Sequence, residues 1–175
     1  MINSPLQNTP GKIAGEWVQI RPRITQGFPD RPEYYAKYGL KGHGGLDFGT
    51  NGDDTIFAPF QGQAKVIYDK DADGKYKGFG LHIKIRDGEK ECVLAHLSEV
   101  YITDGQQVYL GQKLGLMGST GDSSAKHLHF GLRFTDNKGT LWSRSVLNYD
   151  NGYKGYIDPT EYITCWKGSL NKLTL

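Results

Sequence analysis

The chain has 175 residues, of which 37% are hydrophobic and 23% charged, so it is long enough and apolar enough to bury a core. Its net charge of +2, without a basic cluster interleaved with aromatic residues, argues against a nucleic-acid partner. No run approaches the ~20 consecutive apolar residues of a membrane helix, so no membrane partner is expected.

The N-terminal stretch, MINSPLQNTPGK, has no basic region followed by an apolar one and does not resemble a secretory signal. We therefore expect a protein made in the cytoplasm, which needs another route if it acts outside the membrane. Cys92 and Cys165 lie far apart and outside any CxxC spacing, so the sequence predicts neither a disulfide framework nor a structural zinc knuckle.

Short β-prone segments separated by single glycines dominate the chain. Glycine accounts for 24 of the 175 residues, about twice its usual share. The predicted strands fall, in chain order, within residues 15–28, 55–69, 81–87, 91–97, 106–118 and 127–134. This pattern predicts a mainly β fold with antiparallel, sandwich-like sheets and short peripheral helices.

Two short helices are predicted beside these strands. Residues 30–39, DRPEYYAKYG, begin with an Asp and have a Glu three residues later, which is the spacing of a capping box. Residues 158–170, DPTEYITCWKGSL, combine an Asp cap with Pro at the first helical position. Residues 135–156 are polar, aromatic and irregular, and we interpret them as a long surface loop. We expect one domain, 1–175, with its core at about 15–134.

Two of the five histidines lie on alternate positions of one predicted strand, HLHFGLR. Side chains alternate between the faces of a strand, so His127 and His129 point the same way, with Cα atoms about 6.6 Å apart. Leu128 and Phe130 then point into a core. Two surface histidines would give the same pattern as a pair that converges on a metal or a substrate.

A second motif, GHGGLDFGT, places His43 and Asp47 four residues apart. In a fully extended chain their Cα atoms would be about 13 Å apart, too far to share a metal ion. Gly44 and Gly45 permit a bend or bulge that brings the two side chains together. Taken alone, the motif is common by chance and is more typical of a solvated loop than of a metal site.

The other two histidines lie in different settings. His96 falls inside the apolar run CVLAHL, where a core histidine with one hydrogen bond is the simplest interpretation. His82 alternates with Leu81 and Ile83, and shares a polar face of its strand with Lys84, so we expect no metal-binding role for it. One carboxylate and two histidines can supply three zinc ligands and leave the fourth position open, as a catalytic site requires.

The order of these motifs resembles the lysostaphin/LytM-type zinc endopeptidases of bacterial cell walls. The resemblance rests on HxxxD, then AHLS, then HLHF after the glycine-rich GLMGSTGDSSA, and it extends from about Arg23 to Arg133. A DPTEYI segment near the C-terminal end is also similar to the family. The segment before HLHF departs from the family's frequent Pro, because Lys126 stands there; this affects a loop rather than a ligand.

The resemblance implies a Zn²⁺ cofactor and a role for each motif residue. It makes His43, Asp47 and His129 the zinc ligands, and His96 and His127 the catalytic pair. Zinc would lower the pKa of a bound water, one histidine would take up its proton, and the other would stabilise the developing oxyanion. The sequence does not distinguish which histidine does which. Several family members also have an upstream tyrosine that stabilises this oxyanion, and Tyr38 is the nearest candidate, with Tyr34 and Tyr35 before it.

The implied function is cleavage of peptide bonds in peptidoglycan by a monomeric enzyme, with the peptide as its partner. The apparent lack of a secretory signal favours a phage endolysin, released through a holin, or a virion-associated lysin. The alternative is a catalytically silent activator or wall-assembly module of the same fold. Such modules lose zinc ligands, and here the ligands and both catalytic histidines are present.

Overall fold

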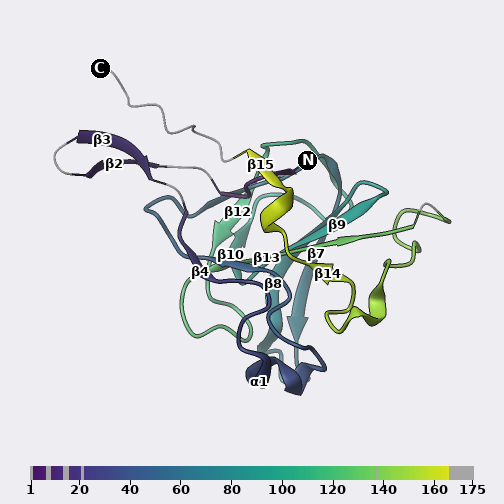
Figure 1. Ribbon diagram of the computed structural model, residues 1–175. Coiled ribbons are helices and arrows are strands. Elements are labelled where there is room, and N and C mark those ends of the chain that lie inside the picture. The colour runs from purple at the N-terminus through teal and green to yellow at the C-terminus, as the bar shows by residue number, and fades with distance from the viewer. Residues whose placement is uncertain (1, 7–8, 14–15, 21, 137, 166–175) are drawn as a thin grey trace.

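The computed structural model describes residues 2–6, 9–13, 16–20, 22–136 and 138–165 (Figure 1). Within this part of the chain, strands are far more extensive than helices, as predicted. The largest sheet is antiparallel, and its strand order is β11 (Gln107–Val108), β7 (Gly62–Lys70), β8 (Tyr76–Arg86), β9 (Lys90–Ala95), β13 (Leu128–Phe134), β5 (Leu46–Phe48), β4 (Ile24–Gln26). Strand β14 (Tyr156–Ile157) also pairs with β13.

Three smaller sheets complete the described strands. One has the order β10 (Leu97–Val100), β12 (Lys113–Met117), β6 (Thr55–Phe57). The others pair β1 (Ile2–Asn3) with β15 (Ile163–Cys165), in parallel, and β2 (Thr9–Ile13) with β3 (Glu16–Ile20). Figure 1 shows the β2–β3 hairpin projecting from the body of the molecule, with α1 at the lower end.

A single hydrophobic cluster joins the large sheet to the sheet of β10, β12 and β6. From β8 it takes Leu81, Ile83 and Ile85, and from β13 it takes Leu128 and Phe130, all buried. The smaller sheet contributes four buried side chains: Ile56, Leu97, Leu114 and Met117. The two sheets therefore pack as the layers of a sandwich, as predicted. The cluster also includes Ile2, Leu6 and Ile163, which lie outside residues 15–134.

The first predicted helix exists, but its predicted cap is wrong. The structure has α1 (Pro32–Tyr35) followed by a 3-10 turn, η1 (Ala36–Tyr38), which ends at Gly39 as expected. The residue before the helix is Arg31, with φ 55°, and it provides no side-chain cap. The carboxylate of Asp30 instead accepts a hydrogen bond from the backbone N–H of Gly27 at 2.7 Å and closes the preceding turn.

The second predicted helix is wrong beyond its first turn. Residues Thr160–Tyr162 form a 3-10 turn, η3, whose entry is closed by Asp158 as acceptor for the Thr160 N–H. The chain then becomes extended as β15, because pairing with β1 and burial of Ile163 outweigh the local helical preference. Residues 166–170 lie outside the described residues.

Residues 135–156 are largely irregular, as predicted, but they are not only a surface loop. They include a 3-10 turn, η2 (Tyr149–Asn151), and they lie against the polar face of β8. There, Arg86 donates a hydrogen bond to the Leu141 carbonyl at 2.8 Å. This segment covers Arg86, which is buried although it lies on the polar side of the strand. His82, on the same side of the strand, is also buried.

The described helices are all short. None of them has the length and hydropathy that a membrane-spanning helix needs. Cys92 is buried and free, and the side chain of Cys165 lies outside the described part of the chain.

Candidate metal centre

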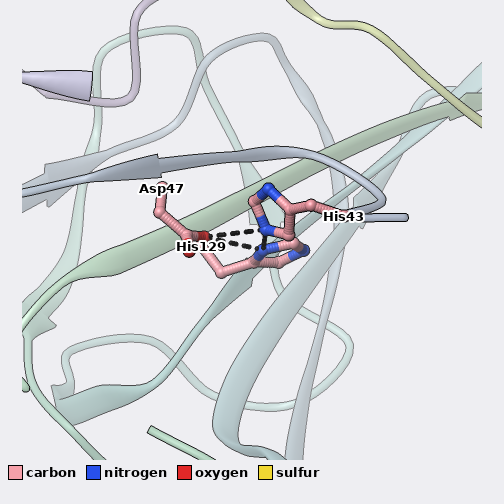
Figure 2. A group of neighbouring side chains, drawn as sticks. All are labelled: His43, Asp47 and His129. Carbon is pink, nitrogen blue, oxygen red and sulfur yellow. Dashed lines mark hydrogen bonds and ion pairs between the residues drawn. The ribbon is translucent and has the colours of Figure 1, made fainter. Parts of the chain in front are cut away.

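Three side chains from two adjacent strands and the turn before them converge at one point. Asp47 in β5 lies directly opposite His129 in β13, and His43 lies in the turn that leads into β5. Asp47 Oδ1 is 3.0 Å from both His43 Nε2 and His129 Nδ1, and these two nitrogens are 2.9 Å apart (Figure 2). All three residues are buried.

This spacing fits a shared metal ion. Tetrahedral zinc with bonds of about 2.0–2.1 Å separates its ligand atoms by roughly 3.3 Å. The three atoms therefore need to move apart by only a few tenths of an ångström. The His43 ring is already oriented, because its Nδ1 donates to the Gly27 carbonyl at 2.9 Å and leaves Nε2 as the ligand atom. The expected bend between His43 and Asp47 is confirmed.

The two glycines of the motif have different surroundings. A Cβ atom on Gly45 would lie 2.4 Å from the Phe130 carbonyl oxygen and 2.9 Å from Cε1 of His129. On Gly44, the nearest atom would be 3.7 Å away, in Tyr156. Neither glycine has a positive φ. Gly45 is therefore needed because the turn passes close to β13, not because its backbone has an unusual conformation.

His127 and His96 lie beside this group. His127 immediately precedes β13, and its Nε2 is 3.7 Å from Asp47 Oδ2, so it faces the same side as His129, as predicted. The ring centroids of His96 and His127 are 4.7 Å apart. The Nδ1 of His127 lies 2.8 Å from the Ala125 carbonyl, which makes Nδ1 the protonated nitrogen and leaves Nε2 with its lone pair.

His96 reaches the site through an uncommon backbone conformation. It lies between β9 and β10 and has φ 64°, a left-handed value that non-glycine residues rarely adopt. The backbone N–H of His96 donates to the Phe79 carbonyl at 3.0 Å, and its Nδ1 donates to the Thr120 carbonyl at 2.7 Å. Such strain is often found at functional sites, and nothing in the sequence CVLAHL signals it.

The buried environment changes the proton affinities of the site. Burial, reinforced by His129, lowers the pKa of His96 to about 4, so the ring is neutral at pH 7. Burial alone would raise the pKa of Asp47, but hydrogen bonds with His129 and His43 outweigh it and hold that pKa below its ordinary value. Asp47 is therefore ionised, as a metal ligand must be.

The structure separates the three tyrosines that precede the site. Tyr38 donates a hydrogen bond at 2.8 Å to Asp122, which lies in the loop between β12 and β13. The ring of Tyr35 instead lies 5.3 Å from that of His43, and burial together with Asp47 raises its pKa to about 12. Tyr34 is exposed. Tyr38 is the nearest candidate in the sequence, whereas in the structure Tyr35 is the tyrosine beside His43, one of the three residues of the metal group, His43, Asp47 and His129.

An open cavity of about 850 Å³ extends from this group across the polar face of the large sheet. It is lined at one end by His96, His127 and His129, and farther along by Lys84 and Arg133. Residues 34–38 and 121–124 form parts of its walls. His82 is not among the lining residues, and its Nδ1 donates to the Gly80 carbonyl at 3.1 Å.

Phe79 lies on the cavity floor next to the metal group. Its ring stacks on that of His129, with centroids 5.2 Å apart and planes at 25°. Positive φ values at Gly78 and Gly80 accompany a shift in the β7–β8 register and turn this part of β8 toward the site.

A buried His–Asp–His group with two further histidines in an open cavity is the arrangement of a metal-dependent hydrolase. Residues 41–140 match the model of peptidase family M23, and the chain belongs to this family. It is 30% identical over 115 residues to an uncharacterized metalloprotease of Haemophilus influenzae, covering 65% of this chain and 23% of that protein. It is 31% identical over 108 residues to the peptidoglycan DD-endopeptidase ShyB of Vibrio cholerae, covering 62% of this chain and 24% of that protein.

Solved structures have the same fold. The catalytic domain of lysostaphin from Staphylococcus simulans matches with a TM-score of 0.55 and 24% identity, over 81% of this chain and 91% of that one. A zinc-containing peptidase from Vibrio cholerae matches with a TM-score of 0.53 and 26% identity, over 79% of this chain and 41% of that one. The chain spans about a quarter of the length of the curated relatives named above.

Proposed function

We propose that this protein is a zinc-dependent endopeptidase that cleaves peptide bonds in bacterial peptidoglycan. The observation that carries the proposal is the convergence of three metal-ligand atoms and two additional histidines at one end of an open cavity. The name of the relative from Vibrio cholerae, a peptidoglycan DD-endopeptidase, supports peptidoglycan as the substrate.

In this proposal His43, Asp47 and His129 hold the zinc ion. When bound there, zinc would lower the pKa of a coordinated water and polarise the scissile carbonyl. Asp47 contributes a negative charge that is held in place by both histidines. The burial of these residues keeps the ligands fixed before the substrate arrives.

His96 and His127 move the protons. Each ring donates its Nδ1 proton to a backbone carbonyl, of Thr120 and Ala125 respectively, so each has Nε2 available for the reaction. One accepts a proton from the attacking water and passes one to the leaving amine, while the other, when protonated, donates a hydrogen bond to the oxyanion. Tyr35, beside His43, is a further candidate donor to that oxyanion.

A groove over a sheet, with walls from residues 34–38 and 121–124, suits an extended peptide and excludes folded proteins. The described residues that line the cavity include three carboxylates, Asp47, Asp69 and Asp122. Asp47 belongs to the metal group and Asp122 accepts a hydrogen bond from Tyr38, so a free pair of carboxylates, as in a glycosidase, is not formed by these three. The proposed reaction is therefore amide hydrolysis.

A silent activator of the same fold is the second candidate. The chain is 33% identical over 94 residues to the murein hydrolase activator NlpD of Escherichia coli, covering 53% of this chain and 23% of that protein. The complete set of ligand and proton-transfer residues, brought together in one cavity, favours the enzyme. A phage origin stays a prediction.

The test is digestion of purified peptidoglycan by the zinc-loaded protein. We expect new free amino groups without new reducing sugar ends, abolished by EDTA and restored by zinc. New reducing ends, or digestion of a folded protein while peptidoglycan stays intact, would contradict the proposal. Intact peptidoglycan, together with enhanced lysis when a second hydrolase is added, would favour the activator.

A further inference from the structure

The cavity has a basic end, away from the metal group, whose charges are not balanced. The carboxylate of Glu91 in β9 is buried there between two guanidinium groups. Its Oε1 accepts a hydrogen bond from Nε of Arg133 at 2.9 Å, and its Oε2 accepts one from Nε of Arg86 at the same distance. Both oxygens of the only carboxylate in this cluster of described residues are therefore occupied.

Lys84 is the cation near this cluster that has no ion-pair partner among the described residues. It lines the cavity and is half-buried, and its ammonium makes no hydrogen bond or ion pair with the described residues. Burial lowers the pKa of Lys84; the nearby charge of Glu91 opposes this shift, but burial together with the cations Arg133 and Arg86 outweighs it. An anion placed beside its Nζ would relieve both effects.

The other charges in the cavity do not supply that anion. Among its lining residues Asp47 belongs to the metal group, Asp122 accepts a hydrogen bond from Tyr38, and Asp69 lies beside Gly78. The basic lining residues outnumber these three, and they are Arg31, Lys37, Lys84, Arg133 and Lys154. The basic end of the cavity therefore favours a ligand that places a negative charge there.

The strand register gives the separation between the two ends. Lys84 pairs with Val93 in β9, and Val93 pairs with Gly131 in β13, two positions from His129. Two strand spacings and two residue steps place Lys84 and His129 roughly 12 Å apart at their Cα atoms. The cavity is lined by Phe79 and Tyr156, which pack with the buried Val93 in one apolar cluster. An extended peptide covers this distance in about three residues.

We propose that Lys84 binds a carboxylate of the substrate peptide, two or three residues from the bond that is cleaved at the metal group. This inference rests on the proposed function and specifies its substrate: an acidic peptide, with a free C-terminal or side-chain carboxylate, rather than a neutral glycine bridge. Arg133 and Arg86 support the site by charge, since their hydrogen bonds go to Glu91 and to backbone carbonyls.

The test is binding of three capped synthetic peptides to the zinc-loaded protein, measured by calorimetry, with cleavage followed in parallel. One peptide ends in a free carboxylate, one has an amidated end and one internal Glu, and one is amidated and neutral. We expect at least one acidic peptide to bind about tenfold more tightly than the neutral one, the scale of a hydrogen bond to a charged group. Which of the two binds more tightly identifies the kind of carboxylate.

Lys84→Met should abolish the preference, and Lys84→Arg should retain most of it. Lys65→Met is the matched control, because Lys65 pairs with Lys84 across β7 and β8 but packs on the ring of Trp142 outside the cavity. Equal binding of acidic and neutral peptides by the unmodified protein, or an unchanged preference in Lys84→Met, would overturn the inference. If the preference is found but peptidoglycan stays uncut, the proposed function fails and the anion site stands.

Discussion

His43 Nε2 lies 3.0 Å from Asp47 Oδ1, although the two residues are four positions apart in the chain. They are this close because the turn between them packs directly against β13. The closeness depends on a missing side chain at Gly45, where a Cβ would overlap the backbone oxygen of Phe130. The metal group thus depends on how two strands pack as much as on which ligands they carry.

Gly45→Ala should therefore disrupt the metal group. We expect it to destabilise the protein by about 2 kcal/mol, as for other overpacked sites, and to weaken zinc binding. Gly44→Ala is the matched control, because its new methyl group would meet Tyr156 at ordinary contact distance. Thermal unfolding and zinc content measure both effects. Equal behaviour of the two variants would show that close packing at Gly45 is unimportant.

Asp47→Ala and His129→Ala should each lose zinc. Because a bound metal stabilises the folded state by mass action, the zinc-dependent gain in melting temperature should disappear in both variants. His82→Ala should keep its zinc, since His82 lies outside the ligand group. Metal analysis after dialysis checks the prediction, and full occupancy in Asp47→Ala would reject the ligand assignment.

His127→Ala and His96→Ala should retain zinc, but the turnover rate should fall by about 10²-fold or more, as is usual when a general acid or base is removed. The reason is that both rings lie beside the metal group without sharing its ligand atoms. Turnover of peptidoglycan and zinc content should be measured on the same preparations. A variant that loses its zinc as readily as His129→Ala would identify that histidine as a ligand.

The left-handed backbone of His96 predicts a difference between two inactive variants. His96→Gly should be more stable than His96→Ala by about 1 kcal/mol, because glycine adopts φ 64° without a steric penalty. Denaturant unfolding of the zinc-loaded proteins provides the comparison. If His96→Ala is the more stable, the backbone at this position is not strained.

Glu91 predicts a loss of stability in acid. Burial would raise its pKa, but Arg133, Lys84 and Arg86 outweigh this and hold the pKa below the ordinary value. The stabilisation is therefore complete above the unfolded-state pKa near 4.5 and is lost as the pH falls through the lower folded-state value.

Glu91→Gln should cost about 3 kcal/mol at pH 7, because it leaves the buried Arg86 and the half-buried Arg133 without their counterion. The stability of this variant should also fall less steeply in acid. Glu89→Gln is the control, since Glu89 is exposed. Urea unfolding between pH 7 and pH 3 measures both. Parallel acid profiles for Glu91→Gln and the unmodified protein would contradict the prediction.

Much of the fold could be predicted because alternation within a strand is a local property. Leu128 and Phe130 had to face away from His127 and His129 in any extended segment, and the structure places them so. The same alternation separated His82 from the apolar side of β8. These inferences needed only neighbouring residues, and they held.

What the sequence by itself determined was therefore which side chains share a face; how the faces meet was decided by tertiary structure. Asp30 does not cap the helix, because its carboxylate closes the preceding turn at Gly27 instead. The segment after Tyr162 is a strand, because pairing with distant β1 outweighs its local helical preference. The left-handed turn at His96, the contact of Tyr35 with His43, and the position of half-buried Lys84 near Glu91 depend on how separate elements pack together. Packing energies of this kind arise only when separate strands and loops come together, so no local pattern encodes them.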